Sequence, residues 1–181
     1  MTPPPAYIQL ALVAMVTIAA LWDLRFRRIP NWLTASGVVA GLAIQAGLGG
    51  WAGLRSAAFG LGLALLVYLP LFLLRAMGGG DVKLMAAVGA FLGPKNWIVA
   101  FLLISIAGGL IALLLALIKG RLSRTLHNVS IILSDLVRLR APYGRNPELD
   151  VTSGAGITLP RGVVIALGTF AFLALARLLA E

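Results

Sequence analysis

Apolar segments long enough to cross a bilayer recur along most of this chain, and they limit its fold more than any other feature. A transmembrane α-helix needs roughly 20 predominantly apolar residues. The composition agrees, because 60% of the 181 residues are hydrophobic and only 12% are charged. The sequence therefore predicts an all-α, polytopic membrane helix bundle, with residues 1–181 forming a single integral-membrane domain and no separate soluble domain.

Six transmembrane helices and one amphipathic interfacial helix are expected. The amphipathic helix is predicted at 121–140, where apolar side chains recur at helical spacing among polar ones. The fourth span has only 12 residues, which rise about 18 Å against a hydrocarbon core of roughly 30 Å. We therefore expect its ends to lie recessed within the protein. The expected spans are approximately 7–22, 32–50, 54–74, 82–93, 97–118 and 161–179.

The basic residues indicate how the chain is oriented. In the predicted topology all 15 Lys and Arg residues except Arg55, Lys95 and Arg177 fall on one face of the membrane. Positive residues collect in cytoplasmic loops. This predicts a cytoplasmic segment at 119–160 and both termini in the periplasm, and it explains the net charge of +9 without a nucleic-acid partner.

The scarcity of two residue types excludes several kinds of site. The chain has no cysteine, which excludes disulfides, thiol catalysis and thiolate zinc sites. His127 is the only histidine, which argues against a serine–histidine triad and against a metal site with several histidines. We therefore expect neither a metal nor a cofactor.

Two aspartates, Asp23 and Asp81, lie at the ends of apolar spans. A charged side chain at the bilayer centre costs about 2.5–3.5 kcal/mol on insertion scales, so an acid at such a position suggests a use or a partner. Two predicted crossings separate the two acids, so both should lie on the cytoplasmic side. The remaining acids belong to the amphipathic segment, the following loop or the C-terminal tail: Asp135, Glu148, Asp150 and Glu181.

A close pair of carboxylates suits peptide hydrolysis without a covalent intermediate. Two such groups in a partly desolvated site would share one proton near neutral pH. The ionised member can then take a proton from water, while the protonated member hydrogen-bonds the scissile carbonyl. The glycine run 78–80 before Asp81 has no Cβ atoms and would let an extended peptide approach the main chain.

Other interpretations of these acids remain open on these grounds alone. Asp81 could cap the helix that follows it, and Asp23 could pair with Arg25 or Arg27. The two acids could instead serve a proton- or cation-coupled transporter, or the chain could be a non-catalytic assembly scaffold.

Two stretches of the sequence resemble the catalytic motifs of the type IV prepilin peptidase family. Gly78-Gly79-Gly80-Asp81, followed by Val82-Lys83-Leu84-Met85, is similar to the family's Gly-x-Gly-Asp motif. The segment 23–34, Asp-Leu-Arg-Phe-Arg-Arg-Ile-Pro-Asn-Trp-Leu-Thr, is similar to the first motif in the short peptidases of tight-adherence (Flp) pilus systems. Leu159-Pro160-Arg161-Gly162, with Gly168, resembles the start of the family's last helix.

The resemblance implies a multi-pass aspartic endopeptidase of the bacterial inner membrane. It would remove the short basic leader from prepilins and pseudopilins at the cytoplasmic face, typically after a glycine. Asp23 and Asp81 would be the catalytic pair, and Gly78, Gly79 and Gly80 would belong to the active-site loop. Lys83 matches a family lysine and would orient or tune Asp81, although a snorkelling lysine at a helix end fits equally well. The implied partners are leader peptides and membrane lipid, not nucleic acid.

The chain also departs from the larger bifunctional prepilin peptidases. It has no cysteine-rich cytoplasmic zinc domain, and no long segment precedes Asp23. We therefore expect peptidase activity without N-methyltransferase activity. Presenilin-type proteases share Gly-x-Gly-Asp, but nothing in this sequence resembles their other motifs.

Overall fold

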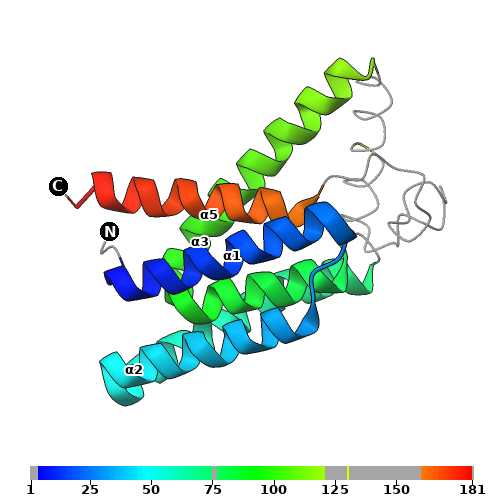
Figure 1. Cartoon of the computed structure of the whole chain (residues 1–181). Helices are drawn as coiled ribbons and strands as arrows, with labels where there is room; N and C mark the ends of the chain where they lie inside the picture. The colour runs from blue at the N-terminus through cyan, green and yellow to red at the C-terminus, as the bar shows by residue number, and fades with distance from the viewer. Residues whose placement is uncertain (1–3, 75–76, 121–129, 131–159, 181) are drawn as a thin grey trace.

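The computed structural model describes residues 4–74, 77–120, 130 and 160–180. In this part of the chain the architecture is all-helical (Figure 1). Each of four helices is long and apolar enough to cross a membrane, by length and composition. They are α1 (Ala6–Phe26), α2 (Asn31–Leu73), α3 (Gly79–Ile118) and α5 (Arg161–Leu178).

The expectation of six separate transmembrane helices plus an amphipathic one is wrong, because the described residues form four helices. The predicted second and third spans are both part of α2, and the predicted fourth and fifth spans are both part of α3. The first and last spans correspond to α1 and α5, whose bounds differ slightly from those expected. The amphipathic helix predicted at 121–140 lies outside the described residues, apart from Ser130.

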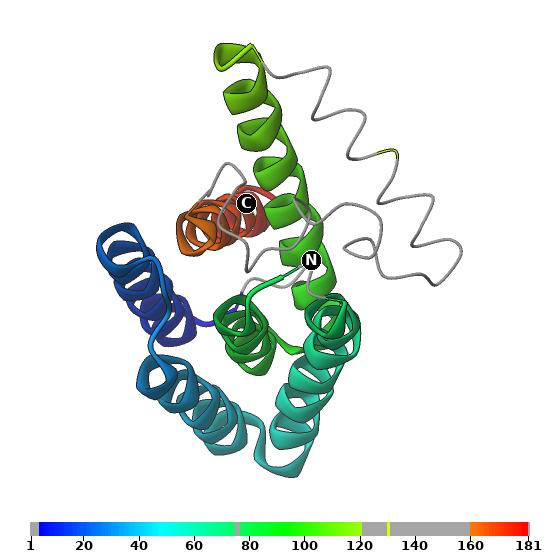
Figure 2. The ribbon, with the colours of Figure 1, turned by 90° about the vertical axis from the view of Figure 1, so that its right-hand side faces the viewer.

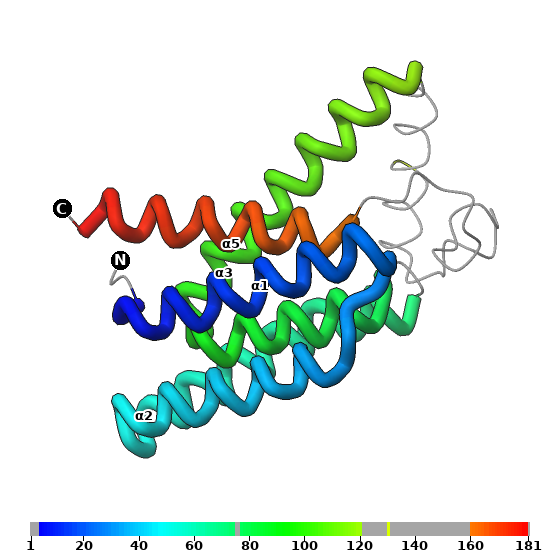
Figure 3. The backbone as a smooth tube through the Cα atoms, in the orientation of Figure 1, coloured from blue at the N-terminus to red at the C-terminus, as the bar shows by residue number. Residues whose placement is uncertain are grey.

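A single glycine takes the place of the expected connecting loop within each of the two long helices. Gly50 has φ 55° and ψ −136° within α2, and Gly93 has φ 69° and ψ 173° within α3. Positive φ is easily adopted by glycine, which has no Cβ. The helical axis therefore changes direction at one residue, with no connecting loop. Figure 3 shows α2 turning back on itself at the end of the molecule that holds both termini.

The helix ends that surround the predicted acids are set by local sequence. α1 ends at Phe26, and Arg27 then adopts a left-handed conformation with φ 55°. The Arg27 N–H donates a hydrogen bond of 2.9 Å to the Asp23 carbonyl oxygen, which holds Asp23 in the last turn. Pro30 and Pro160 directly precede α2 and α5. Proline has a fixed φ and no N–H, so it suits a helix start and not a helix interior.

The centre of the bundle is the inner arm of α3, residues 79–93, whereas residues 94–118 form its outer arm. Figure 2 shows the inner arm surrounded by α1, both arms of α2, and the region of α5 and the outer arm. From Asp81 to Gly93 every side chain except that of Lys83 is buried. Gly60 of α2 and Gly89 of α3 face each other so closely that a Cβ at Gly89 would lie 2.7 Å from the Gly60 carbonyl carbon.

This packing gathers three helix ends at one end of the molecule. The C-terminal end of α1 and the N-terminal ends of α3 and α5 lie together, whereas the two chain termini lie at the opposite end (Figure 1). α2 leaves this end and returns to it, since its two arms run in opposite directions (Figure 3). The two aspartates predicted to work together are therefore at the same end of the bundle.

Candidate active site

Asp23 lies in the last turn of α1, buried against the start of α5. The residue is only 7% exposed. The backbone N–H of Gly162 donates a hydrogen bond of 2.8 Å to Asp23 Oδ2. The first N–H groups of a helix have no partner within that helix, and the N-terminal end carries partial positive charge. The start of α5 therefore supplies both a donor and a favourable field to the Asp23 carboxylate.

Asp81 is in the first turn of α3 and is 8% exposed. Its backbone N–H donates to the Gly78 carbonyl oxygen at 3.2 Å, which anchors it at the helix start. The Arg161 guanidinium donates from Nη1 to Asp81 Oδ2 at 3.2 Å, forming an ion pair. A charged hydrogen bond of this kind is stronger than a neutral one, and it stabilises a carboxylate removed from water.

The structure thus brings the two aspartates together through consecutive residues of α5. Arg161 contacts Asp81, and Gly162 contacts Asp23. A pair of interacting acids with positively polarised donors on one side can bind a water molecule and exchange protons with it.

The predicted active-site glycines form a helix start rather than an extended loop. Gly78 is the N-cap of α3, and Gly79 and Gly80 are its first two residues. A Cβ at Gly78 would lie 3.3 Å from Asp81 Oδ2, and a Cβ at Gly80 would lie 3.2 Å from Ile29 Cβ. A Cβ at Gly79 would lie 3.2 Å from an edge atom of the Phe72 ring. All three glycines therefore occupy positions where a side chain would crowd a neighbour.

Lys83 does not join this cluster. Its side chain is exposed, and Nζ donates a hydrogen bond of 2.8 Å to Asn31 Oδ1 at the start of α2. The contact links α2 to α3 beside the two acids. Its predicted role in tuning Asp81 has no direct contact to support it.

Residues 10–113, more than half of the chain, match the type IV leader peptidase family. The chain belongs to the type IV leader peptidase family. No curated protein and no solved structure matches it. The matched region contains Asp23, Asp81, all of α2 and most of α3. Together with its long apolar helices, this makes the chain a membrane protein and a peptidase.

Sequence reasoning did not assign two residues of the leader peptidase that touch the aspartates. Arg161 and Gly162 belong to the stretch that resembles the start of the family's last helix, but the sequence gives neither of them a contact with an aspartate. Both lie outside the family match, which ends at residue 113. The available signal was Pro160, because a proline at a helix start places the free N–H groups of the next residues at a predictable site. Which carboxylate they would meet depends on tertiary packing.

A cavity of about 230 Å³ adjoins Asp81 in the leader peptidase. Residues of α5 and of the α3 outer arm line it: Arg161, Val164 and Ile165 of α5, and Ile104, Ser105, Gly108 and Gly109 of α3. Tyr68 of α2 and Met77 complete the lining. Because Asp81 forms part of the wall, a molecule in this cavity would lie against one of the two acids.

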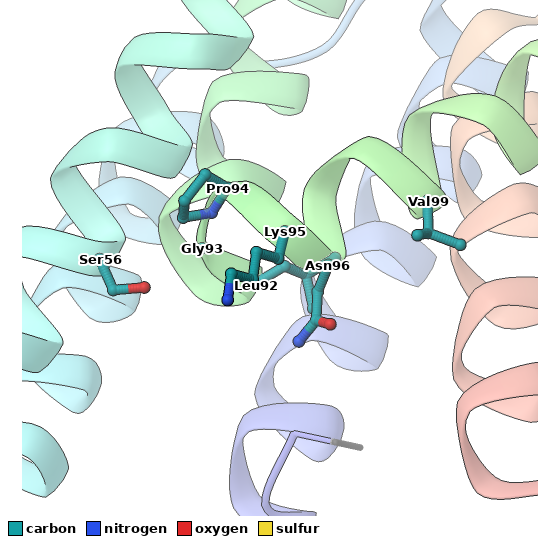
Figure 4. Close-up of a pocket in the computed structure, with 7 residues that line it drawn as sticks. All are labelled: Ser56, Leu92, Gly93, Pro94, Lys95, Asn96 and Val99. Atoms are coloured by element: carbon teal, nitrogen blue, oxygen red, sulfur yellow. The ribbon is translucent and has the colours of Figure 1, made fainter. Parts of the chain in front are cut away.

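A second cavity, of about 570 Å³, lies around the bend of α3 at Gly93 (Figure 4). The figure shows Ser56 of α2 facing Gly93, with Lys95 and Asn96 projecting from the next turn. The inner arm of α3 separates this cavity from Asp81 by about 18 Å of helical rise. No acid lines it, so it lacks the groups that the proposed hydrolysis needs. Across the described ranges, no cluster of three or more His, Cys, Asp or Glu residues could hold a metal ion.

Proposed function

We propose that this leader peptidase is an aspartic endopeptidase in which Asp23 and Asp81 are the catalytic pair. One observation carries the proposal: consecutive residues at the start of α5 contact both carboxylates, so the two acids share one site. Both are buried at the same end of the bundle, although 57 residues separate them in the sequence. Aspartates held together in this way suit the activation of water by one member of the pair.

The proposed reaction uses one proton shared between the acids. The ionised aspartate removes a proton from water as the water oxygen bonds to the scissile carbonyl carbon. The protonated aspartate gives its proton to the carbonyl oxygen, which yields a tetrahedral intermediate. When that intermediate collapses, the C–N bond breaks, and the aspartate that took the water proton gives it to the leaving amine nitrogen. The other aspartate takes a proton from a hydroxyl of the intermediate, so the carboxyl product forms and the pair again holds one proton. General acid–base catalysis of this type contributes about 10²–10⁴-fold to the rate.

The proposed substrates are prepilins and pseudopilins of a tight-adherence (Flp) type IV pilus. The chain would remove their short basic leader peptides at the cytoplasmic face of the bacterial inner membrane. Support comes from the family match and from the basic residues beside the two acids, Arg25, Arg27 and Arg28, which favour a cytoplasmic location for that end. The chain termini, at the opposite end of the bundle, would then be periplasmic (Figure 1). With no cysteine for a zinc domain, the peptidase would act without an N-methyltransferase activity.

The direct test replaces each acid with its neutral isostere. Asp23→Asn and Asp81→Asn should each lower leader removal at least 10²-fold, because neither variant can hold and exchange the shared proton. The measurement is the length of a coexpressed small pilin precursor from the same genome, followed on gels and by mass spectrometry.

Asp135→Asn is the matched control, because this acid lies outside the predicted apolar spans. It should process the precursor like the unmodified protein. Membrane fractionation should show equal amounts of all three variants in the membrane. Full processing by either the Asp23 or the Asp81 variant would refute the proposal, as would ion-coupled transport by the purified protein with no change in precursor length.

A further inference from the structure

The cavity around Gly93, hereafter the bend cavity, is lined by three side chains that can donate hydrogen bonds. Ser56 of α2 contributes a hydroxyl, and Lys95 and Asn96 of α3 contribute an ammonium group and a carboxamide. In Figure 4 the Lys95 and Asn96 side chains both project downwards from the ribbon, and the Ser56 hydroxyl points towards them from the neighbouring helix. The bend cavity therefore presents several donors and one full positive charge to a ligand.

The positive charge at the bend cavity has no acid beside it among the described residues. The acids of the described ranges are Asp23 and Asp81, and both lie at the opposite end of the bundle. Arg55, which directly precedes Ser56, is exposed and adds a second positive charge at the same end. A ligand with negative charge would therefore meet opposite charge at this cavity, without an acid of the described ranges to repel it.

We propose that the bend cavity binds the phosphate group of an anionic phospholipid, from the leaflet at the end of the bundle that holds the chain termini. Lysine binds phosphate as a point charge, and hydrogen bonds that involve a charged partner are stronger than neutral ones. The Ser56 hydroxyl and the Asn96 carboxamide would donate to the remaining phosphate oxygens. The volume of about 570 Å³ lies within the range of roughly 300–1,000 Å³ that is typical of small-molecule sites. Such a site would be independent of the reaction at the aspartates.

The surface next to the bend cavity is apolar, which favours a lipid over a soluble anion. Val99 contributes an apolar side chain to the lining. Phe59 follows Ser56 by three positions and Ile98 follows Lys95 by three positions, so each shares a helix face with its polar neighbour. Phe59 and Ile98 are both exposed. The second arm of α2 and the outer arm of α3 run from the bend towards the other end of the molecule (Figure 1). An acyl chain attached to the bound phosphate would therefore run along these apolar side chains, deeper in the membrane.

A ligand in the bend cavity would hold α2 and α3 together where α3 changes direction. Ser56 packs directly on the bend, because a Cβ at Gly93 would lie 2.5 Å from Ser56 Oγ. Lys95 and Asn96 lie on the other side of the same bend, within α3. A phosphate bound by residues of both helices would link them. A ligand that binds the folded chain and not the unfolded chain raises stability, so binding should be visible as a higher unfolding midpoint.

The test measures binding of phosphatidylglycerol to the purified full-length chain in detergent, by native mass spectrometry and by thermal unfolding. Phosphatidylglycerol should bind more tightly than phosphatidylcholine, which carries no net charge, and should raise the unfolding midpoint further. Lys95→Gln should weaken phosphatidylglycerol binding at least about 10-fold, because a hydrogen bond between charged groups is lost. Lys95→Arg keeps the charge and should retain most of the binding.

Arg55→Gln is the matched control, because it removes a positive charge next to Ser56 from a residue that does not line the cavity. It should weaken binding much less than Lys95→Gln does. Equal losses in the two variants would indicate a general attraction between a basic surface and anionic lipid, and would overturn the site. Equal binding of the two lipids by the unmodified protein would overturn it as well.

Glycerol phosphate separates the two possible sources of the phosphate, because it carries the group without acyl chains. It should bind far more weakly than phosphatidylglycerol, since the contacts with the apolar surface are missing. If glycerol phosphate bound as tightly as the phospholipid and the Lys95→Gln variant lost both, the cavity would be a site for a soluble phosphate and the lipid proposal would be wrong.

Discussion

The position of Asp23 is unfavourable until α5 is considered. The last turn of a helix carries partial negative charge, which disfavours an acid there. Removing the carboxylate from water adds to that cost. The Gly162 N–H at 2.8 Å offsets both effects, because it presents the positive end of a second helix to the same oxygen. Asp81 differs, since the first turn of a helix favours an acid, and Arg161 supplies a full positive charge in addition.

Gly162 should therefore be sensitive to the smallest added side chain. A Cβ there would lie 2.9 Å from Asp23 Cβ and 3.2 Å from the Ala19 carbonyl oxygen, so α1 and α5 would have to separate. We expect Gly162→Ala to lower kcat at least about 10-fold, because misplacing a reacting group by about 1 Å can cost 10²-fold. The measurement is kcat and KM for a synthetic precursor peptide that the unmodified protein cleaves efficiently.

Helix propensity cannot account for such a loss, because alanine is a better helix former than glycine. Gly47→Ala, where a Cβ has no atom within 4 Å, serves as the control and should keep the unmodified kcat. Equal kcat values for the two variants would show that the contact between Gly162 and Asp23 does not matter for the reaction.

At the scale of single residues, the sequence carried the information needed to select Asp23 and Asp81 as a pair. They are the acids at the ends of apolar runs, and an even number of crossings returns the chain to the same side. The sequence did not carry enough information to show that Arg161, among 15 basic residues, would be the partner of Asp81. Nor could it show that Lys83, three positions from Gly80, would bond to Asn31 instead of Asp81. Such choices depend on how helices pack, which local spacing does not encode.

At the scale of helices, α2 and α3 approach each other closely at glycines. A Cβ at Gly60 would lie 2.8 Å from Gly93 Cα, a contact with backbone that no side-chain rotation relieves. Gly60→Ala should therefore destabilise the fold by about 1–3 kcal/mol, as overpacking does in other cores. Thermal unfolding in detergent, followed by circular dichroism, would show this as a lowered midpoint.

Gly62 lies two positions further along α2, where a Cβ has open space, and it makes a matched comparison. Gly62→Ala should leave the midpoint unchanged or raise it slightly, with a gain of up to about 1 kcal/mol from helix propensity. If Gly60→Ala were as stable as Gly62→Ala, the close packing of α2 on α3 would be in doubt.

The number of helices is the part of the fold that was predicted wrongly from the sequence. Gly49-Gly50-Trp51 and the region of Gly93 and Pro94 both have the composition of a turn, and a turn normally ends a helix. In the structure only one residue at each place leaves helical geometry. Sequence pattern locates the change of direction well. It does not distinguish a loop of several residues from a single glycine with positive φ.

At the scale of the whole molecule, α1 and α5 are joined by polar contacts near both of their ends. At one end the Gly162 N–H bonds to Asp23. At the other, Arg177 donates from Nε and Nη2 to Gln9 Oε1 at 2.9 and 2.6 Å. Gln9 is itself buried and donates to the Pro4 carbonyl oxygen at 2.7 Å. Sliding or rotation of α5 along α1 would break contacts at both ends, so we expect the two helices to move as one unit.

A covalent link between these helices should therefore leave the enzyme active. The chain has no cysteine, so Gln9→Cys with Arg177→Cys can be joined by a short thiol-specific crosslinker without side reactions. The linked protein should retain at least about half of the leader-cleaving activity of the unlinked double variant, since no step would require α1 and α5 to part. Each single-cysteine variant treated with the same reagent controls for modification alone. Inactivation that a cleavable linker reverses would show that the two helices must separate during turnover.

The shielding of the α3 inner arm has a consequence for how the molecule meets the bilayer. Hydrophobic mismatch arises where a helix touches lipid, and a short lipid-facing helix forces the bilayer to thin around it. From Asp81 to Gly93 this segment touches other helices almost everywhere, so its shortness imposes no such deformation. The helices around it are the ones that meet the lipid, so they alone have to match the thickness of the membrane. The two acids at the start and the side of this shielded segment then need no local thinning of the lipid.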